Sequence, residues 1–407
     1  MGVGHMTRIT VWDGAHYVGG NKILLQDEGL TLWLDLGQNL SRLMEYYEEY
    51  LKPQKARGLY ELLVMELLPP VQGIYHAHCL EDYGFEQWRD TLEEVHGVLL
   101  SHAHLDHAGD LQYLREEVPL FCSRESALLL RALQDVGNDD GTIYVRRFEL
   151  KDGEWQKVAW NRKGDTLASF RPVRCADEDG VDENAQEFWT RLPEGRETKC
   201  TVRPLEPFGG VLNGHQVRFF PIDHSIPGAG AWAVETSAGW VVYTGDIRFR
   251  GERKHLTERF LQEAEKLKPV ALVIEGTRIG KSGSGYTEHA VQEGALELLR
   301  RSAGKLVMAN FSMTHLERLE RFWQSAREVG RRLVVNPKDL YLLHAWHKSG
   351  RALDLQDGSL CLYQGVGKPP PRRGRSTYTP TTEVCASPQR SWRAVRATTC
   401  SASATLT

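Results

Sequence analysis

The stretch GVLLSHAHLDHAGD, residues 97–110, places four potential metal ligands within six residues, directly after a short apolar run. The apolar run predicts a buried strand, and the polar residues that follow lie in the turn at its end. Side chains two residues apart on an extended segment point to the same side, so His102 and His104 can reach one ion. The next turn can bring Asp106 and His107 to a second ion. Imidazoles and a carboxylate in this arrangement suit a borderline-soft divalent cation such as Zn²⁺.

Other apolar runs end at residues that could join or support this cluster. QVRFFPID is followed by His224, WVVYTGD ends at Asp246, and LTLWLD ends at Asp35. We expect His224 and Asp246 to meet the cluster, and Asp35 to orient one of its ligands from behind. A single histidine is more often an ordinary surface or core residue. Four ligands so closely spaced, with matching residues at later strand ends, nevertheless favour a metal site.

The composition is that of a globular protein in a reducing compartment. The 407 residues are 41% hydrophobic and 26% charged, which excludes a collagen, a disulfide miniprotein and a wholly disordered chain, and favours two domains. The seven cysteines are scattered without a CxxC pair, so we expect a reduced, cytoplasmic chain rather than a disulfide framework or a thiolate zinc site. We find neither a secretory signal nor an apolar run long enough to cross a membrane. The net charge of −4 gives no overall signature of nucleic-acid binding.

Three regions of the chain differ in their sequence patterns. Residues 1–282 contain short strands and helices that predict an α/β domain around the cluster. From 283 to 364 helices and strands alternate, with a strand expected at KLVMAN, residues 305–310, which predicts a parallel sheet. Residues 365–407 carry seven basic side chains against one acidic side chain, a net charge of +6. We expect this Pro-, Ser- and Thr-rich tail to be disordered, with a basic RNA-binding arm as the alternative.

These motifs resemble those of the metallo-β-lactamase superfamily of metal-dependent hydrolases, whose signature HxHxDH matches residues 102–107. HSIPG, which begins at His224, and YTGDIRF around Asp246 are more similar to the β-CASP branch, which includes ribonuclease J and the polyadenylation-factor nucleases. VIEGTR, with Glu275 at a strand end, resembles the first extra acidic motif of that branch. NFSMTHLERLERF resembles the start of its inserted cap domain.

The resemblance implies a fold and a set of functional residues. The fold is α/β, with a metallo-β-lactamase αββα sandwich over residues 1–282 and part of a β-CASP-like α/β cap over residues 283–364. Asp35 would orient a ligand from the second shell of the site, and Glu275 would support the site or transfer a proton. The residues implied in catalysis are Asp106, Asp246 and Glu275. The implied metal ligands are His102, His104 and His224 for one Zn²⁺, Asp106 and His107 for a second, and Asp246 as the bridge.

The implied activity is hydrolysis of phosphodiester bonds by a metal-activated hydroxide. RNA matches the resemblance better than DNA as the substrate, and no membrane partner is expected. Whether the chain cuts internally or as an exonuclease, and whether it forms a homodimer, is left open. A hydrolase of the same superfamily that acts on a small thioester or lactone is the alternative enzyme.

A third alternative is an inactive copy that serves as a scaffold. In the β-CASP branch the chain leaves the cap and returns to supply a further histidine to the second metal. We find no matching Gly-His motif, and His344 and His347 are expected on a helix instead. A truncated or frame-disrupted chain that lacks the second metal therefore also fits this sequence.

Overall fold

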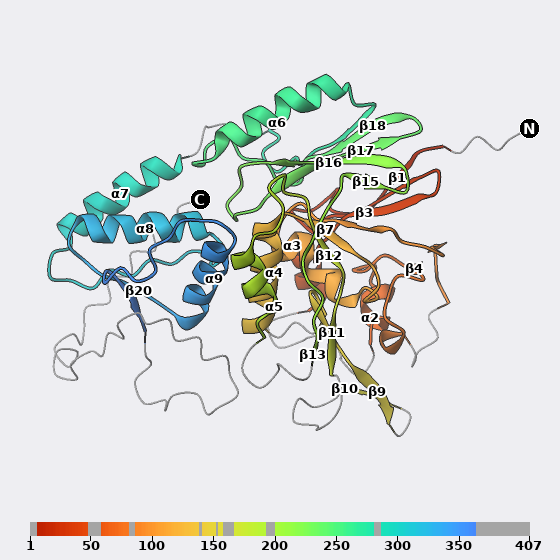
Figure 1. Cartoon of the computed structure of the whole chain (residues 1–407), viewed down its shortest axis with the longest axis horizontal. Coiled ribbons are helices and arrows are strands. Elements are labelled where there is room, and N and C mark those ends of the chain that lie inside the picture. The colour runs from red at the N-terminus through yellow and green to blue at the C-terminus, as the bar shows by residue number, and fades with distance from the viewer. Residues whose placement is uncertain are drawn as a thin grey trace, which may run out of the picture.

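The computed structural model describes residues 6–47, 58–80, 86–137, 141–151, 154–157, 167–192, 200–280 and 286–363. Within these residues two β-sheets stack face to face with helices on their outer faces, and further helices lie to one side (Figure 1). The predicted fold class, an αββα sandwich followed by part of an α/β cap, is confirmed. The predicted basic tail over 365–407 and the predicted boundary at 282 and 283 fall outside the described residues.

The first sheet carries the HAHLDH segment at the end of its central strand β6. Its strand order is β1-β2-β3-β6-β7-β12-β14. β1, β2 and β3 pair antiparallel, whereas β3, β6, β7, β12 and β14 pair in parallel and therefore end at the same edge of the sheet. In chain order the seven strands are Arg8–Asp13, Lys22–Asp27, Leu30–Leu36, Gly97–Leu99, Leu120–Cys122, Val173–Cys175 and Glu206–Pro207.

The second sheet brings the two later ligand candidates to one edge. Its order is β15-β16-β17-β18-β19, antiparallel except for the parallel pair of β18 and β19. Because β17 runs antiparallel to both of its neighbours, β16 and β18 end at the same edge, close to His224 and Asp246. The five strands are Val211–Leu212, His215–Pro221, Gly230–Thr236, Gly239–Tyr243 and Ala271–Val273.

Apolar side chains alternate between the two faces of the second sheet, as the period of a strand requires. Trp232 on β17 is fully buried between the sheets, in one cluster with Leu34 and Leu99 of the first sheet. The next residue, Ala233, faces the other side and packs with Phe260 of α6 (Lys254–Leu267). Helix α6 therefore forms the outer layer over the second sheet (Figure 1).

Helices cover the outer face of the first sheet. The longest of them there is α4 (Arg124–Val136), which begins where the Ser123 hydroxyl accepts a hydrogen bond from the Ser126 N–H and ends at Gly137. The smaller helices are α1 (Leu40–Tyr46), α2 (Tyr60–Val64), η2 (Ala77–Cys79), α3 (Leu105–Ala108), η3 (Gly109–Tyr113) and α5 (Glu183–Thr190). The minor strands are β4 (Val71–Gln72), β5 (Asp90–Thr91), β8 (Tyr144–Arg146), β9 (Phe148–Lys151), β10 (Glu154–Lys157), β11 (Ala168–Phe170) and β13 (Cys200–Thr201).

The segment after residue 286, which we call the cap, packs directly on this layer. It comprises α7 (Glu288–Arg301), α8 (Leu316–Glu328), β20 (Leu333–Val335), α9 (Pro337–Lys348) and β21 (Leu360–Leu362), with β20 and β21 paired in parallel. Helix α9 lies against α4, and Leu343 and Trp346 of α9 belong to the same hydrophobic cluster as Leu128 of α4 (Figure 1). The cap and the sandwich therefore share one continuous core.

The expected strand at KLVMAN is wrong in the structure. Residues 306–310 are irregular, and the side chains of Leu306 and Met308 are 62% and 87% exposed. No strand in the described parts of the chain pairs with this segment. A lone extended segment leaves its backbone groups without a ladder partner, so high strand propensity is not enough to form one. Separately, none of the helices among the described residues combines the length and apolar content that a bilayer span demands.

Candidate metal centre

The candidate ligands meet where strands of both sheets end. The segment from Ser101 to His107 follows β6, His224 follows β16 after Ile222 and Asp223, and Asp246 follows β18 by three residues. His104 is the residue before α3, so its side chain stays beside the strand end while α3 turns Asp106 and His107 back toward it.

The first group of ligand atoms contains three imidazole nitrogens. His102, His104 and His224 each offer one nitrogen, and these nitrogens lie within 4.8 Å of one another. His104 Nδ1 is 3.1 Å from His102 Nε2 and 3.2 Å from His224 Nε2. A tetrahedral zinc ion with Zn–N bonds of about 2.0–2.1 Å sets ligand nitrogens about 3.3–3.4 Å apart. The His104 nitrogen therefore lies from each of the other two at close to the spacing that one such ion requires.

The second group shares His102 with the first. His102, His107 and Asp246 offer ligand atoms within 4.8 Å of one another. His107 Nε2 is buried without a hydrogen-bond partner, and it lies 3.4 Å from Asp246 Oδ1 and 3.9 Å from Asp106 Oδ2. Asp246 Oδ2 lies 3.8 Å from His224 Nε2, which puts this carboxylate between the two groups. A buried, unpartnered imidazole nitrogen facing two carboxylates fits a divalent cation.

Hydrogen bonds to Asp35 and Ser101 determine which ring nitrogen of His102 and of His107 faces the candidate metal centre. Asp35 Oδ2 accepts from Ser101 Oγ at 2.6 Å and from His107 Nδ1 at 2.6 Å. Because the Ser101 hydroxyl proton goes to Asp35, its oxygen accepts from His102 Nδ1 at 2.9 Å. Both imidazoles therefore hold a proton on Nδ1 and turn Nε2 toward the centre, the atom with which they would bind a metal.

The sequence reasoning missed two further residues behind Asp35. The Tyr243 hydroxyl donates to Asp35 Oδ2 at 2.5 Å and accepts from Asn21 Nδ2 at 3.0 Å. Asp35 also accepts from the Ser101 N–H at 2.6 Å, so four donors converge on this fully buried carboxylate, which has a left-handed φ of +58°. No spacing rule links Tyr243 to Asp35 across 208 residues. A buried tyrosine at the end of an apolar strand was the only available signal.

The glycine-rich loop between β1 and β2 contacts Asp106 directly. The N–H groups of Gly20 and Asn21 donate to the Asp106 carbonyl at 2.9 and 3.2 Å. A Cβ on Gly19, whose φ is +77°, would lie only 2.3 Å from Asp106 Oδ2. The loop between β1 and β2 therefore packs against Asp106 at a distance that only glycine permits. Asp106 is outside both ligand groups, but it lies within 3.9 Å of His107.

Burial determines the protonation of the first group. It lowers the pKa of His104 to about 4 and that of His224 to about 3, and it lowers the pKa of His102 well below its ordinary value. These imidazoles are therefore neutral, which is the form that binds metals. For His107 burial acts in the same direction, but the carboxylates of Asp246 and Asp35 outweigh it and raise the pKa to about 10. Metal binding at His107 therefore releases a proton.

Glu275 lies beside the centre but outside both ligand groups. It follows β19, and its Oε1 accepts from the Ile247 N–H at 3.2 Å, next to Asp246. Its Oε2 accepts from the Thr277 hydroxyl. His344 and His347 lie on α9 as expected, and His347 Nδ1 donates to the Arg351 carbonyl at 3.1 Å.

Parts of this chain are similar to known proteins. Residues 85–192 match a family model described as a beta-lactamase superfamily domain. The chain is 25% identical over 251 residues to ribonuclease J 2 of Streptococcus pyogenes serotype M3, which covers 60% of this chain and 35% of that protein. It is 28% identical over 250 residues to ribonuclease J of Mycobacterium tuberculosis, covering 60% of this chain and 34% of that protein. The match thus spans about a third of the length of these relatives.

A solved structure of a protein of unknown function from Enterococcus faecalis V583 has the same fold. It covers 88% of this chain and 73% of its own length, with a TM-score of 0.57 and 18% identity. The family model, the two ribonucleases and this shared fold agree with the motifs from which the resemblance was drawn. The chain therefore contains a segment similar to the beta-lactamase superfamily domain, and it resembles ribonuclease J over 60% of its length.

Proposed function

We propose that this protein is a metal-dependent nuclease that hydrolyses phosphodiester bonds of RNA, with Zn²⁺ as its cation. The observation that carries the proposal is the pair of ligand groups that share His102, with Asp246 between them. The similarity to two ribonucleases J over 60% of the chain supports RNA as the substrate. The free thiols of Cys79, Cys122 and Cys175 support a reducing, cytoplasmic location.

We assign each residue of the site a role according to its position. His102, His104 and His224 would hold one cation, and His107 with Asp246 would hold a second, with Asp106 close to His107. A divalent cation held there lowers the pKa of a bound water to about 7 and so supplies a nucleophile at neutral pH. Asp35 and Ser101 keep the ligand imidazoles in the required tautomer, as their hydrogen bonds to His107 and His102 indicate.

Two residues outside the ligand groups are assigned supporting roles. Glu275 holds the backbone next to Asp246 through the Ile247 N–H, so we assign it a positioning role rather than proton transfer. Glu317, in the first turn of α8, accepts from Arg248, and Arg248 in turn donates to the His224 carbonyl at 3.0 Å. The cap therefore borders the metal centre, which suits a long substrate that contacts both parts.

The test is cleavage of a 5′-phosphorylated, fluorescently labelled RNA by the purified full chain, with zinc content measured on the same sample. We expect bound zinc, cleavage that a chelator abolishes and added Zn²⁺ restores, and loss of at least 100-fold in rate for His104→Ala and for Asp246→Asn. A thioester and a lactone assayed in the same buffer examine the alternative enzyme. Cleavage of these compounds without cleavage of RNA would overturn the proposal in favour of a small-molecule hydrolase, and a metal-free, inactive chain would overturn both.

A further inference from the structure

Arg248 joins the loop of one candidate ligand to the loop of another. It lies two residues after Asp246, and its Nη2 donates to the His224 carbonyl at 3.0 Å. The same Nη2 donates to Asp223 Oδ1 at 2.8 Å, and Nε donates to Asp223 Oδ2 at 3.1 Å. The guanidinium thus holds the backbone of His224 and the residue before it.

Asp223 completes this connection from its own side. Its carboxylate is fully buried and also accepts from the Gly251 N–H at 2.8 Å, while its carbonyl accepts from the Arg248 N–H at 2.9 Å. Its N–H donates to the Thr257 hydroxyl at 2.9 Å, and that hydroxyl donates to the Arg248 carbonyl at 3.0 Å. The loops after β16 and after β18 are therefore joined by several direct hydrogen bonds.

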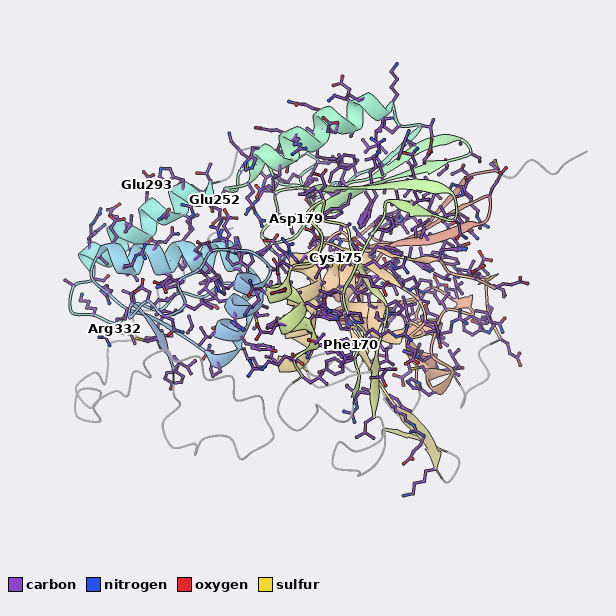
Figure 2. All side chains as sticks on the ribbon, viewed as in Figure 1. Phe170, Cys175, Asp179, Glu252, Glu293 and Arg332 are labelled. Atoms are coloured by element: carbon purple, nitrogen blue, oxygen red, sulfur yellow. The ribbon has the colours of Figure 1, made fainter. Side chains whose placement is uncertain are left out.

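Glu317 of the cap is the third partner of Arg248. It lies in the first turn of α8, is 5% exposed, and accepts from Arg248 Nη2 through Oε2. Its Oε1 accepts from the Glu252 N–H at 2.8 Å, in the same loop that Asp223 holds. Figure 2 shows Glu252 where this loop meets the cap helices, and its side chain lies 3.3 Å from Arg321 of α8. The cap is thus bound to the ligand-bearing loops through a buried carboxylate.

Ion pairs of Arg248 stabilise the contact between the cap and the ligand-bearing loops. Two buried carboxylates, Asp223 and Glu317, share one guanidinium. A third, Glu288 of α7, lies 3.6 Å from Arg248 Nη1. Displacement of α8 would leave Arg248 with Asp223 but without Glu317, and it would leave the Glu317 carboxylate unpaired, which is unfavourable for a buried charge. The hydrogen bond from Arg248 to the His224 carbonyl would then be less firmly held. Charge-assisted bonds through one planar guanidinium also fix direction, which a lysine could not do.

We propose that Arg248 is a positioning residue through which docking of α8 sets the orientation of His224 and Asp246, so that metal affinity at this centre depends on the cap. The inference rests on the proposed metal centre and goes beyond it, because it assigns the cap a role in building that centre. Outer-shell partners of ligands typically contribute 10–100-fold to metal affinity. A purely structural ion pair between the cap and the sandwich would leave metal affinity unchanged.

The experiment measures Zn²⁺ affinity of the full chain by competition with a chromophoric chelator, and the visible spectrum of the Co²⁺ form. We expect Glu317→Ala to weaken Zn²⁺ binding about 10-fold and to alter the Co²⁺ bands. The matched control is Tyr341→Phe, which removes a 2.7 Å hydrogen bond from Tyr341 on α9 to Asp135 on α4. This bond also joins the cap to the sandwich, but neither residue belongs to a loop that carries a candidate ligand. The control should bind Zn²⁺ within twofold of the wild type.

Two further variants keep the inference open to refutation. If Glu317→Ala does not fold by circular dichroism, Glu317→Gln keeps the shape but removes the charge and should weaken binding several-fold. Arg248→Lys keeps one positive charge but cannot reach all three partners, and it should weaken binding to a similar degree. Folded variants that bind Zn²⁺ as tightly as the wild type would overturn the inference. If the wild type binds Zn²⁺ but does not cleave RNA, the proposed function fails, whereas the variants still test whether Arg248 and Glu317 affect metal affinity.

Discussion

Replacing Asp35 by asparagine examines the support of the metal centre most directly. The carboxylate receives one donor on Oδ1, the Ser101 N–H, and three on Oδ2, from Ser101 Oγ, His107 Nδ1 and the Tyr243 hydroxyl. An amide offers one accepting oxygen. If that oxygen faces the three donors, the NH₂ group opposes the Ser101 N–H, and the other orientation opposes three donors at once.

The size of the effect follows from this count. One buried donor left unsatisfied costs about 1–3 kcal/mol, and loss of the negative charge weakens the remaining bonds, so we expect unfolding to become easier by roughly 2–4 kcal/mol. His107 also loses its charged partner on Nδ1, so Zn²⁺ affinity should fall 10–100-fold. Urea unfolding monitored by fluorescence gives the first number, and chelator competition gives the second.

Asp27 provides the matched control for this variant. Its side chain is also fully buried, and it accepts from the Ser237 N–H, the Ser237 hydroxyl and the Thr7 hydroxyl at 2.6, 2.7 and 2.8 Å. It lies at the opposite end of β2 and β3 from the centre. Asp27→Asn should therefore lose stability but keep its Zn²⁺ affinity. The reasoning would be refuted if Asp35→Asn matched the wild type in both measurements, or if both variants lost affinity equally.

Changing Tyr243 to Phe removes one donor to the same carboxylate, and urea unfolding should show a loss of about 1 kcal/mol; unchanged stability would argue against the hydrogen bond. Burial alone would raise the pKa of Glu288, but its cationic neighbours lower it from 4.5 to about 2, so its stabilisation is present above about pH 4.5 and is lost as the pH falls toward 2. Unfolding of the wild type and Glu288→Gln should therefore differ by about 2 kcal/mol at pH 6 and converge near pH 2, whereas a constant difference would contradict the assignment. Gly19→Ala should displace Asp106 and weaken Zn²⁺ binding about 10-fold, since its Cβ would lie 2.3 Å from that carboxylate. Gly29→Ala is the control, because Gly29 has a similar φ of +65° and a Cβ there would have no atom within 4 Å. Calorimetry should detect a loss of stability for this variant, whereas titration should detect no loss of zinc binding.

The fold could be predicted because its apolar strands end in recognisable polar residues. The runs before Asp35, His102, His224 and Asp246 all form strands of the two stacked sheets, and their ends meet as expected. The structure places these side chains close together, whereas their role as metal ligands stays a prediction. The boundary between the two regions also stays a prediction.

The parts of the site and fold that could not be predicted depend on contacts between residues far apart in the sequence. Tyr243 donates to Asp35 from the other sheet, and Asn21 donates to the Tyr243 hydroxyl. Nothing in the neighbouring sequence marks either contact. The strand expected at 305–310 had the right composition, but strand formation also needs a neighbour to pair with. Arg248 stands in an ordinary polar loop, and only the placement of α8 shows what its guanidinium binds.

The shared core of α4 and α9 restricts how a substrate can enter. Leu343 and Trp346 are buried against the same cluster as Leu128, so rotating the cap away as a rigid flap would bring these side chains into water. Such a hinge motion would amount to partial unfolding of the sandwich itself. Access to the ligand cluster by rotation of the whole cap is therefore unfavourable, and thermal melting of the two regions should occur as a single cooperative transition.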